Sequence, residues 1–185
     1  SGDQPRSKYL GGKEIAPPPI TGRTSVMELI DTYFNAYNAA RLREICELYA
    51  NKIASEDVVV GMSFAGALTP AGLGMSCIIP LIERGLVDWI VTTGANCYHD
   101  LHFALGLALR RGSHEVDDTE LLQEGVVRIY DILFDFKTLV ATDTWVTRLL
   151  AQDKFKKIMP TSEINYRLGL NVNREQEKLG LENRS

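Results

Sequence analysis

Two short apolar runs, each followed by a polar or glycine-rich loop and then a helical pattern, occupy the middle of the chain. The first run, residues 58–61, leads into loop 62–74, and the second, residues 87–92, leads into the polar stretch 93–96. Continuous apolar runs of this length are typical of strands covered on both faces. Loops that follow neighbouring parallel strands meet at one sheet edge, where backbone N–H groups can hold a phosphate. The pattern predicts an α/β fold with a dinucleotide-type site.

Helical spacing of apolar positions predicts the remaining elements. Ser25 and Glu28 have the spacing of a capping box, so a helix should begin there, and Gly85 is a plausible helix C-cap. Only two clear strands are predicted, which is few for a doubly wound sheet and indicates an incomplete one. The predicted helices span residues 25–37, 45–53, 75–84, 98–111, 119–136 and 138–151, and a last one begins at residue 161.

Composition predicts an N-terminal arm and one domain, and it argues against several classes of protein. Residues 1–24 are rich in Gly, Pro and charge, which predicts an extended arm before one domain over residues 25–185. A net charge of -4 without a basic block argues against a nucleic-acid surface. Apolar runs of membrane-spanning length and a signal peptide are both lacking. The three cysteines form no CxxC pair, as expected for reduced thiols of a cytoplasmic protein.

The loop from Ser63 to Gly74 is the first stretch that could carry chemistry. Its glycines Gly66, Gly72 and Gly74 let the backbone approach a ligand closely. The spacing is not a clean GxGxxG, so a turn that only packs remains an alternative. Its position after a predicted strand favours the ligand interpretation, because it would face loop 93–96 across one crevice.

The second stretch that could carry chemistry is a polar cluster at the start of the predicted helix after residue 96. His99 and His102 are three residues apart, so a metal is conceivable, although two histidines without a third ligand are more often polar helix residues. A neutral histidine there could instead move a proton or bond an amine. Cys97 could have a lowered pKa at the helix N-terminus, but a buried structural role is the simpler expectation. Trp89 and Trp145 are expected in the core.

These loops resemble the deoxyhypusine synthase family. The matching stretches are residues 61–72, 86–94 and 128–132 together with the helix from Asp100, and the likeness runs from about residue 20 onward. The stretch 93–102, Thr-Gly-Ala-Asn-Cys-Tyr-His-Asp-Leu-His, is similar to the bacterial deoxyhypusine-synthase-like branch, of the homospermidine-synthase type. Eukaryotic members have Thr-Ala-Gly-Gly there, followed by two adjacent glutamates.

The resemblance implies a Rossmann-like parallel sheet with flanking helices, in a homotetramer with NAD and polyamine sites at its interfaces. It also implies NAD-dependent transfer of an aminobutyl group from spermidine or a related polyamine, through a lysine Schiff base, to an acceptor amine. Tyr98 and His99, at the glutamate positions, would contact the polyamine. The residues implied to contact NAD are Ser63, Ala67, Thr69, Gly72, Thr93 and Gly94.

This sequence differs from the family pattern in two ways, and both change the activity expected of the chain. Tyr98 and a neutral His99 can only hydrogen-bond or stack, which favours a small diamine acceptor over a protein lysine. Family chains also continue well beyond the segment matched here, and the Schiff-base lysine belongs to that continuation. We therefore expect an N-terminal half without a catalytic residue of its own, completed by a C-terminal-half chain, since a half sheet exposes a strand edge. The alternatives are an incomplete fragment, an inactive regulatory paralogue that activates a partner subunit, and a plain nucleotide-binding module.

Overall fold

A computed structural model describes residues 7–55 and 57–181, and the chain divides into two compact units, residues 1–58 and 59–185. The predicted arm lies in the first unit, and its residues 1–6 are outside the described range. None of the helices described is both long and apolar enough to cross a membrane.

The first unit is helical. Ser25 Oγ accepts a hydrogen bond from the Glu28 amide at 3.1 Å, which confirms the predicted cap. The prediction that this helix extends to Tyr37 is wrong. The chain leaves the helical conformation at Phe34 (φ -84°, ψ 69°), and Tyr37 begins the next helix. The described elements are η1 (Lys8–Leu10), α1 (Val26–Glu28), η2 (Leu29–Tyr33), α2 (Tyr37–Leu48) and η3 (Tyr49–Ile53).

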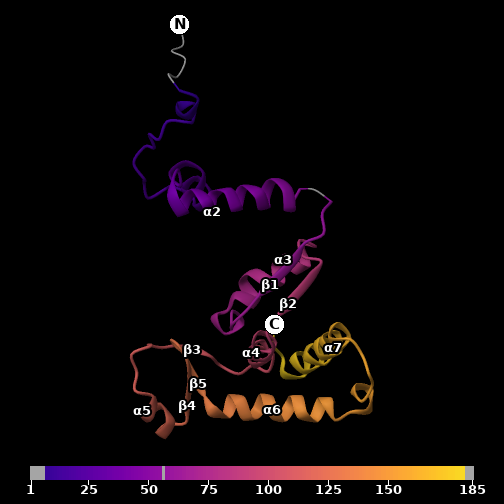
Figure 1. Ribbon diagram of the computed structural model, residues 1–185. Coiled ribbons are helices and arrows are strands. Elements are labelled where there is room, and N and C mark those ends of the chain that lie inside the picture. Colours follow the sequence, from indigo (N-terminus) through magenta and orange to yellow (C-terminus); the bar gives the residue numbers. More distant parts are fainter. Residues whose placement is uncertain (1–6, 56, 182–185) are drawn as a thin grey trace. The chain divides into compact units, whose positions relative to one another are not determined.

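The second unit begins with a two-stranded parallel sheet (Figure 1). Strands β1 (Gly61–Phe64) and β2 (Trp89–Thr92) pair with Gly61 opposite Trp89 and Phe64 opposite Thr92. Their mixed α/β arrangement confirms the broad fold class, although β1 starts where the predicted strand 58–61 ends. The segment between the strands forms η4 (Thr69–Ala71), η5 (Gly74–Ile78) and α3 (Ile79–Glu83), and Gly85 follows α3 with a φ of +67°.

A three-stranded antiparallel sheet replaces two predicted helical segments, so those predictions are wrong. Strands β3 (Arg110–Arg111), β4 (Val126–Ile129) and β5 (Ile132–Asp135) lie in the order β3-β5-β4. Helix α5 (Asp118–Gln123) stops at Gly125, whose φ is +67°. The apolar residues of β4 and β5 fit a helix as well as a strand when read alone, and pairing across the turn favours the strand.

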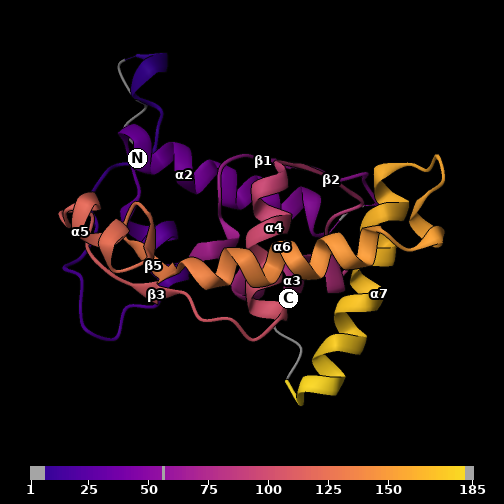
Figure 2. The ribbon, with the colours of Figure 1, turned by 90° about the horizontal axis from the view of Figure 1, so that it is seen from below.

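Three helices of the second unit contact one another through α4. Helix α4 (Gly94–Ala104), shorter than the predicted 98–111 helix at its end, contacts both α6 (Phe136–Leu150) and α7 (Thr161–Leu179), as Figures 1 and 2 show. The start of α7 at Thr161 confirms the prediction, and η6 (Asp153–Phe155) lies between α6 and α7. The described core of this unit combines apolar and polar side chains, namely Ala104, Phe134, Leu149, Val172, Thr69, Asn96, His102, Thr138, Thr142 and Gln176.

Trp89 does not belong to this core. It is 53% exposed, which contradicts the expected core position. Its ring lies over Gly61 in the neighbouring strand, where a Cβ atom on Gly61 would come within 2.1 Å of the indole. The glycine therefore allows the ring to cover the backbone of β1.

Candidate functional site

The loops that follow β1 and β2 are joined by the side chain of Asn96. This residue is 2% exposed in the first turn of α4, and its Oδ1 accepts hydrogen bonds from the amides of Leu68 (2.6 Å) and Thr69 (3.3 Å). In return, the Thr69 hydroxyl donates to the Asn96 carbonyl at 2.7 Å. The expected meeting of the two loops is thereby confirmed, whereas the part played by Asn96 could not be read from the sequence.

Thr93 makes a second connection between the loops. Its hydroxyl donates to the Gly66 carbonyl at 2.8 Å and accepts from Asn96 Nδ2 at 3.2 Å, while Asn96 Nδ2 also donates to Thr92 Oγ1 at 2.9 Å. Thr93 is the N-cap residue of α4, yet its side chain makes no capping bond. The Asn96 amide donates to the Thr93 carbonyl at 3.2 Å, whereas the amides of Gly94 and Ala95 keep their capacity to bind an acceptor from outside the helix.

The residues predicted to contact NAD lie on both sides of this junction. Ser63 lies in β1, opposite Val91 of β2, and is exposed. Thr93 and Gly94 are exposed at the start of α4, whereas Ala67 and Gly72 are half-buried in the loop after β1. Thr69 is buried and bonded to Asn96, so the structure gives it a role in holding the loop.

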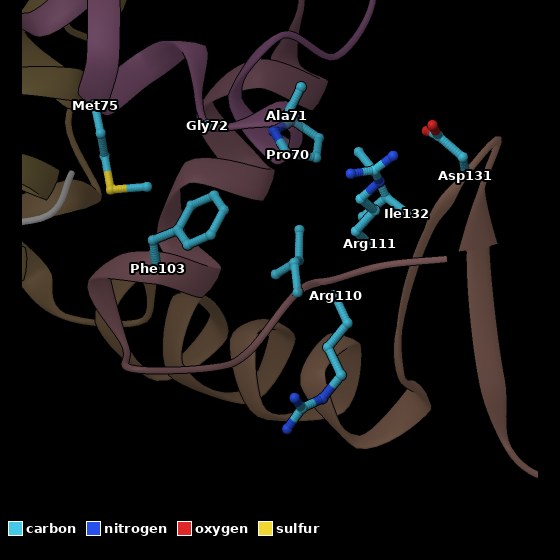
Figure 3. A pocket seen from close by; sticks show the side chains of 10 residues that line it. Pro70, Ala71, Gly72, Met75, Phe103, Arg110, Arg111, Asp131 and Ile132 are labelled. Atoms are coloured by element: carbon cyan, nitrogen blue, oxygen red, sulfur yellow. The ribbon is translucent and has the colours of Figure 1, made fainter. Parts of the chain in front are cut away.

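A pocket of about 390 Å³ lies beside Gly72 (Figure 3). The turn Pro70–Gly72 forms one side, Phe103 of α4 another, and Arg110, Arg111 and Asp131 approach from the antiparallel sheet. In Figure 3 the Arg111 side chain projects toward the turn and Arg110 projects away from it. Arg111 of β3 thus brings a positive charge to the pocket, and Asp131 brings a negative one.

Tyr98 is held by a carboxylate from another helix. Its hydroxyl donates to Asp143 Oδ1 at 2.7 Å, and Asp143 is an exposed residue of α6. Burial of the phenol, the hydrogen bond to Asp143 and the charge of that carboxylate together raise the pKa of Tyr98 to about 12. Sequence reasoning missed Asp143, because it lies 45 residues from Tyr98 and carries no local motif.

His99 and His102 lie on the same side of α4 as Tyr98 and form a hydrogen-bonded chain. His99 Nδ1 is 3.1 Å from His102 Nε2, and His102 Nδ1 is 2.8 Å from Thr142 Oγ1. Burial lowers the pKa of His99, and burial together with the proximity of His99 lowers the pKa of His102 to about 4. Both rings are therefore neutral near pH 7.

The adjacent side of α4 faces a second pocket, of about 370 Å³, between α3, α4 and α7. Asp100 and Cys97 line it, and Asp100 Oδ1 is buried with no hydrogen-bond partner among the described residues. Burial raises the pKa of Asp100 to about 6. Cys97 is exposed, which contradicts the expected burial, and desolvation of its sulfur and the charge of Asp100 raise its thiol pKa.

Among the described residues, the two histidines have no third ligand that would make a metal site. Across residues 7–55 and 57–181, no group of three or more His, Cys, Asp or Glu side chains is arranged to hold a metal ion. The second nitrogen of His102 is instead occupied by Thr142. This arrangement favours hydrogen bonding as the role of the pair.

Comparison with known proteins identifies the family. A sequence profile of deoxyhypusine synthase matches residues 27–181. The chain is 48% identical over 176 residues to a deoxyhypusine synthase-like protein of Nostoc punctiforme, and 48% identical over 171 residues to one of Cyanothece sp.. These alignments cover 95% and 92% of this chain, but 45% and 43% of the relatives.

A more distant relative is similar over a shorter region. A probable deoxyhypusine synthase 1 of Methanosarcina acetivorans is 42% identical over 114 residues, which is 61% of this chain and 36% of that protein. The chain thus spans about half the length, or less, of the curated relatives that it matches. The resemblance inferred from the loop motifs is confirmed, and the chain belongs to the deoxyhypusine synthase family.

Proposed function

We propose that this chain supplies part of the NAD and polyamine site of an enzyme that transfers an aminobutyl group from spermidine or a related polyamine to an acceptor amine. The observation that carries the proposal is the junction of the two loops after β1 and β2 through Asn96, in a chain of the deoxyhypusine synthase family. The complete site would include a Rossmann-like continuation of the parallel sheet and a C-terminal-half chain, in a tetrameric assembly.

The loop junction has the properties that a dinucleotide requires. The first N–H groups of α4 have no side-chain cap, and a Cβ atom added to Gly66, Gly72 or Gly94 would meet nothing within 4 Å. Backbone and ligand phosphate can therefore approach closely. Ser63, Ala67, Gly72, Thr93 and Gly94 would hold NAD, and Thr69 would hold the loop. When bound, NAD supplies an acceptor for the hydride that leaves the substrate amine carbon.

The polyamine would meet Tyr98, His99 and Asp143. An ammonium group is attracted by a carboxylate, and Asp143 is exposed while its Oδ1 is already fixed by the Tyr98 hydroxyl. The aromatic ring of Tyr98 offers a cation–π surface beside it. Eukaryotic members of the family have glutamates at the positions of Tyr98 and His99. In this chain, Asp143 of α6 would supply a carboxylate instead.

The first experiment is a denaturing intact-mass measurement of the purified assembly. We expect a species of 20.6 kDa and a second chain that bears the reactive lysine. Borohydride reduction in the presence of spermidine and NAD should then add mass to the second chain alone. An assembly that never gains this adduct, but activates a separate catalytic subunit, would support a regulatory paralogue instead.

Two substitutions test the residues assigned here. Thr93→Val should weaken NAD binding, because it opens the link to Gly66, and His99→Ala should weaken polyamine binding. Thr93→Ser, which retains the hydroxyl, is the matched control for the first. Binding of both ligands to the assembled protein can be followed by calorimetry. If neither variant changes either affinity, the assignment is wrong.

A further inference from the structure

The hydrogen-bonded chain from Thr142 to His99 restricts where the ring protons can lie. His102 is 0% exposed, and both of its ring nitrogens are engaged, Nδ1 with Thr142 and Nε2 with His99. A neutral imidazole has one N–H donor and one acceptor nitrogen. Therefore, if His102 donates toward one neighbour, it must accept from the other, and the proton positions of all three groups are coupled.

Thr142 decides the direction of this chain. It is also 0% exposed, and within the described ranges its hydroxyl contacts His102 Nδ1. In the same helix, Thr144 donates to the Val140 carbonyl one turn earlier at 2.7 Å, whereas the Thr142 hydroxyl makes no such bond. A buried hydroxyl hydrogen without an acceptor is unfavourable. The Thr142 O–H therefore points at His102 Nδ1.

We infer that the Thr142 hydroxyl, acting through His102, fixes the proton of His99 on Nε2. With Nδ1 accepting from Thr142, His102 carries its proton on Nε2 and donates it to His99 Nδ1. A neutral His99 then has its proton on Nε2. The reverse arrangement keeps both ring contacts but leaves the Thr142 hydrogen buried without an acceptor. Thr142 and His102 are thus positioning residues for His99.

The tautomer determines what His99 can recognise. His99 is half-buried, and its Nε2 has no partner within the described part of the chain, so it offers an N–H donor to a ligand. This donor fits a carbonyl or carboxamide oxygen, or an unprotonated amine nitrogen, and it disfavours an ammonium group, which has donors only. Applied to a polyamine, a step that rests on the proposed function, the charged nitrogen belongs at Asp143 and an acceptor atom belongs at His99.

The tautomers can be measured directly in the full chain. Long-range ¹H–¹⁵N correlation spectra at pH 7 distinguish a proton on Nδ1 from one on Nε2. The chain has three histidines, and the third, His114, is exposed and serves as an internal reference. We expect both His99 and His102 to carry their protons on Nε2. A His99 ring with its proton on Nδ1 overturns the inference.

Substitutions at Thr142 test whether its hydroxyl is the cause. Thr142→Val removes the hydroxyl and keeps the shape, so the preference of His99 for the Nε2 proton should fall by a factor of about ten, the effect of one hydrogen bond. Thr142→Ser retains the donor and should keep the wild-type spectrum. A valine variant that also keeps the wild-type tautomers overturns the role of Thr142.

Two controls keep the test decisive. The His114 signals and the circular dichroism spectrum report whether each variant is folded, and Thr142→Ala replaces the valine variant if that one does not fold. Because the spectra are recorded without NAD or polyamine, the tautomer inference can fail while the proposed function stands. Equally, the proposed function can fail in the binding experiments while the tautomers are as inferred.

Discussion

At the scale of single residues, Asn96 is hydrogen-bonded to four others, Leu68, Thr69, Thr92 and Thr93. One buried amide satisfies two backbone N–H groups of the loop after β1 and donates to Thr92 and Thr93. Such a side chain is hard to replace, because each group that it leaves unpaired in the interior costs free energy.

Asn96→Ala should lower the free energy of unfolding by about 3 kcal/mol, since the Leu68 and Thr69 amides lose their acceptor. Asn96→Asp keeps an acceptor for both amides and should cost less. Urea denaturation followed by circular dichroism checks both values, and Asn173→Ala on α7 is a control outside the junction. Equal losses for the alanine and aspartate variants would contradict this account.

Tyr98 should be the last of the seven tyrosines to ionise, because its pKa is raised to about 12. Since the folded pKa lies above the unfolded value near 10, the stability from this group is complete below pH 10 and is lost as the pH rises toward 12. Absorbance at alkaline pH measures the ionisation. Asp143→Asn should lower the pKa of Tyr98, and an unchanged titration curve would exclude the coupling.

Asp100 should make the chain more stable in mild acid. Its folded pKa of about 6 lies above the ordinary aspartate pKa of 3.8, so its contribution is complete below about pH 4 and is lost as the pH rises through 6. Asp100→Asn should remove this dependence and stabilise the chain at pH 7 by up to about 2 kcal/mol, after allowance for its partial exposure. Thermal unfolding between pH 4 and 7 tests it, and identical profiles for the two proteins would refute it.

At the scale of elements, the parallel pair β1 and β2 depends on a close approach between Gly61 and the Trp89 ring. A side chain at residue 61 must displace the indole, which is half exposed and can move. Both strands are only four residues long, so the sheet has little other pairing to compensate.

Gly61→Ala should therefore expose Trp89 further and destabilise the chain by about 1 kcal/mol. The fluorescence of Trp89, isolated by Trp145→Phe, should shift to the red. Combining Gly61→Ala with Trp89→Leu should remove most of the penalty, because the clashing ring is gone. Full additivity of the two substitutions would show that the ring does not cause the strain.

The hairpin of β4 and β5 shows how pairing overrides a local pattern. Val126, Val127, Ile129 and Ile132 are β-branched and suit a strand, but their apolar spacing also fitted the predicted helix 119–136. The two-residue turn is made by Tyr130, at φ +55°, and Asp131, without the glycine that commonly marks such turns. The turn signal was therefore weak in the sequence.

At the scale of the whole molecule, the parallel sheet is small. Within the described residues it has two strands, and Trp89 and Val91 of β2 are more than half exposed. Open strand edges favour pairing with a further chain.

Addition of the proposed C-terminal-half chain should slow hydrogen exchange at the amides of β1 and β2. The expected reason is new strand pairing, so amides of the antiparallel sheet should change much less and serve as the control. Exchange followed by mass spectrometry resolves the two regions. Uniform protection, or none, would contradict completion of the sheet by that chain.

Features that depend on neighbours along the chain could be predicted from the sequence. The Ser25 cap, the two strand–loop–helix units and the start of α7 follow from local spacing, and the family was indicated by the resemblance of the loop motifs. Residue types at the loop ends also indicated where a ligand site should lie.

Contacts between side chains far apart in the sequence became visible only in the folded structure. Asn96 reaches Leu68, Tyr98 reaches Asp143 and His102 reaches Thr142 across 28, 45 and 40 residues, respectively. Local periodicity carries no information about such pairs, because they depend on how α4 packs against the loop and α6. The choice of strand over helix at β4 and β5 has the same cause, since ladder hydrogen bonds form only once the chain has turned back on itself.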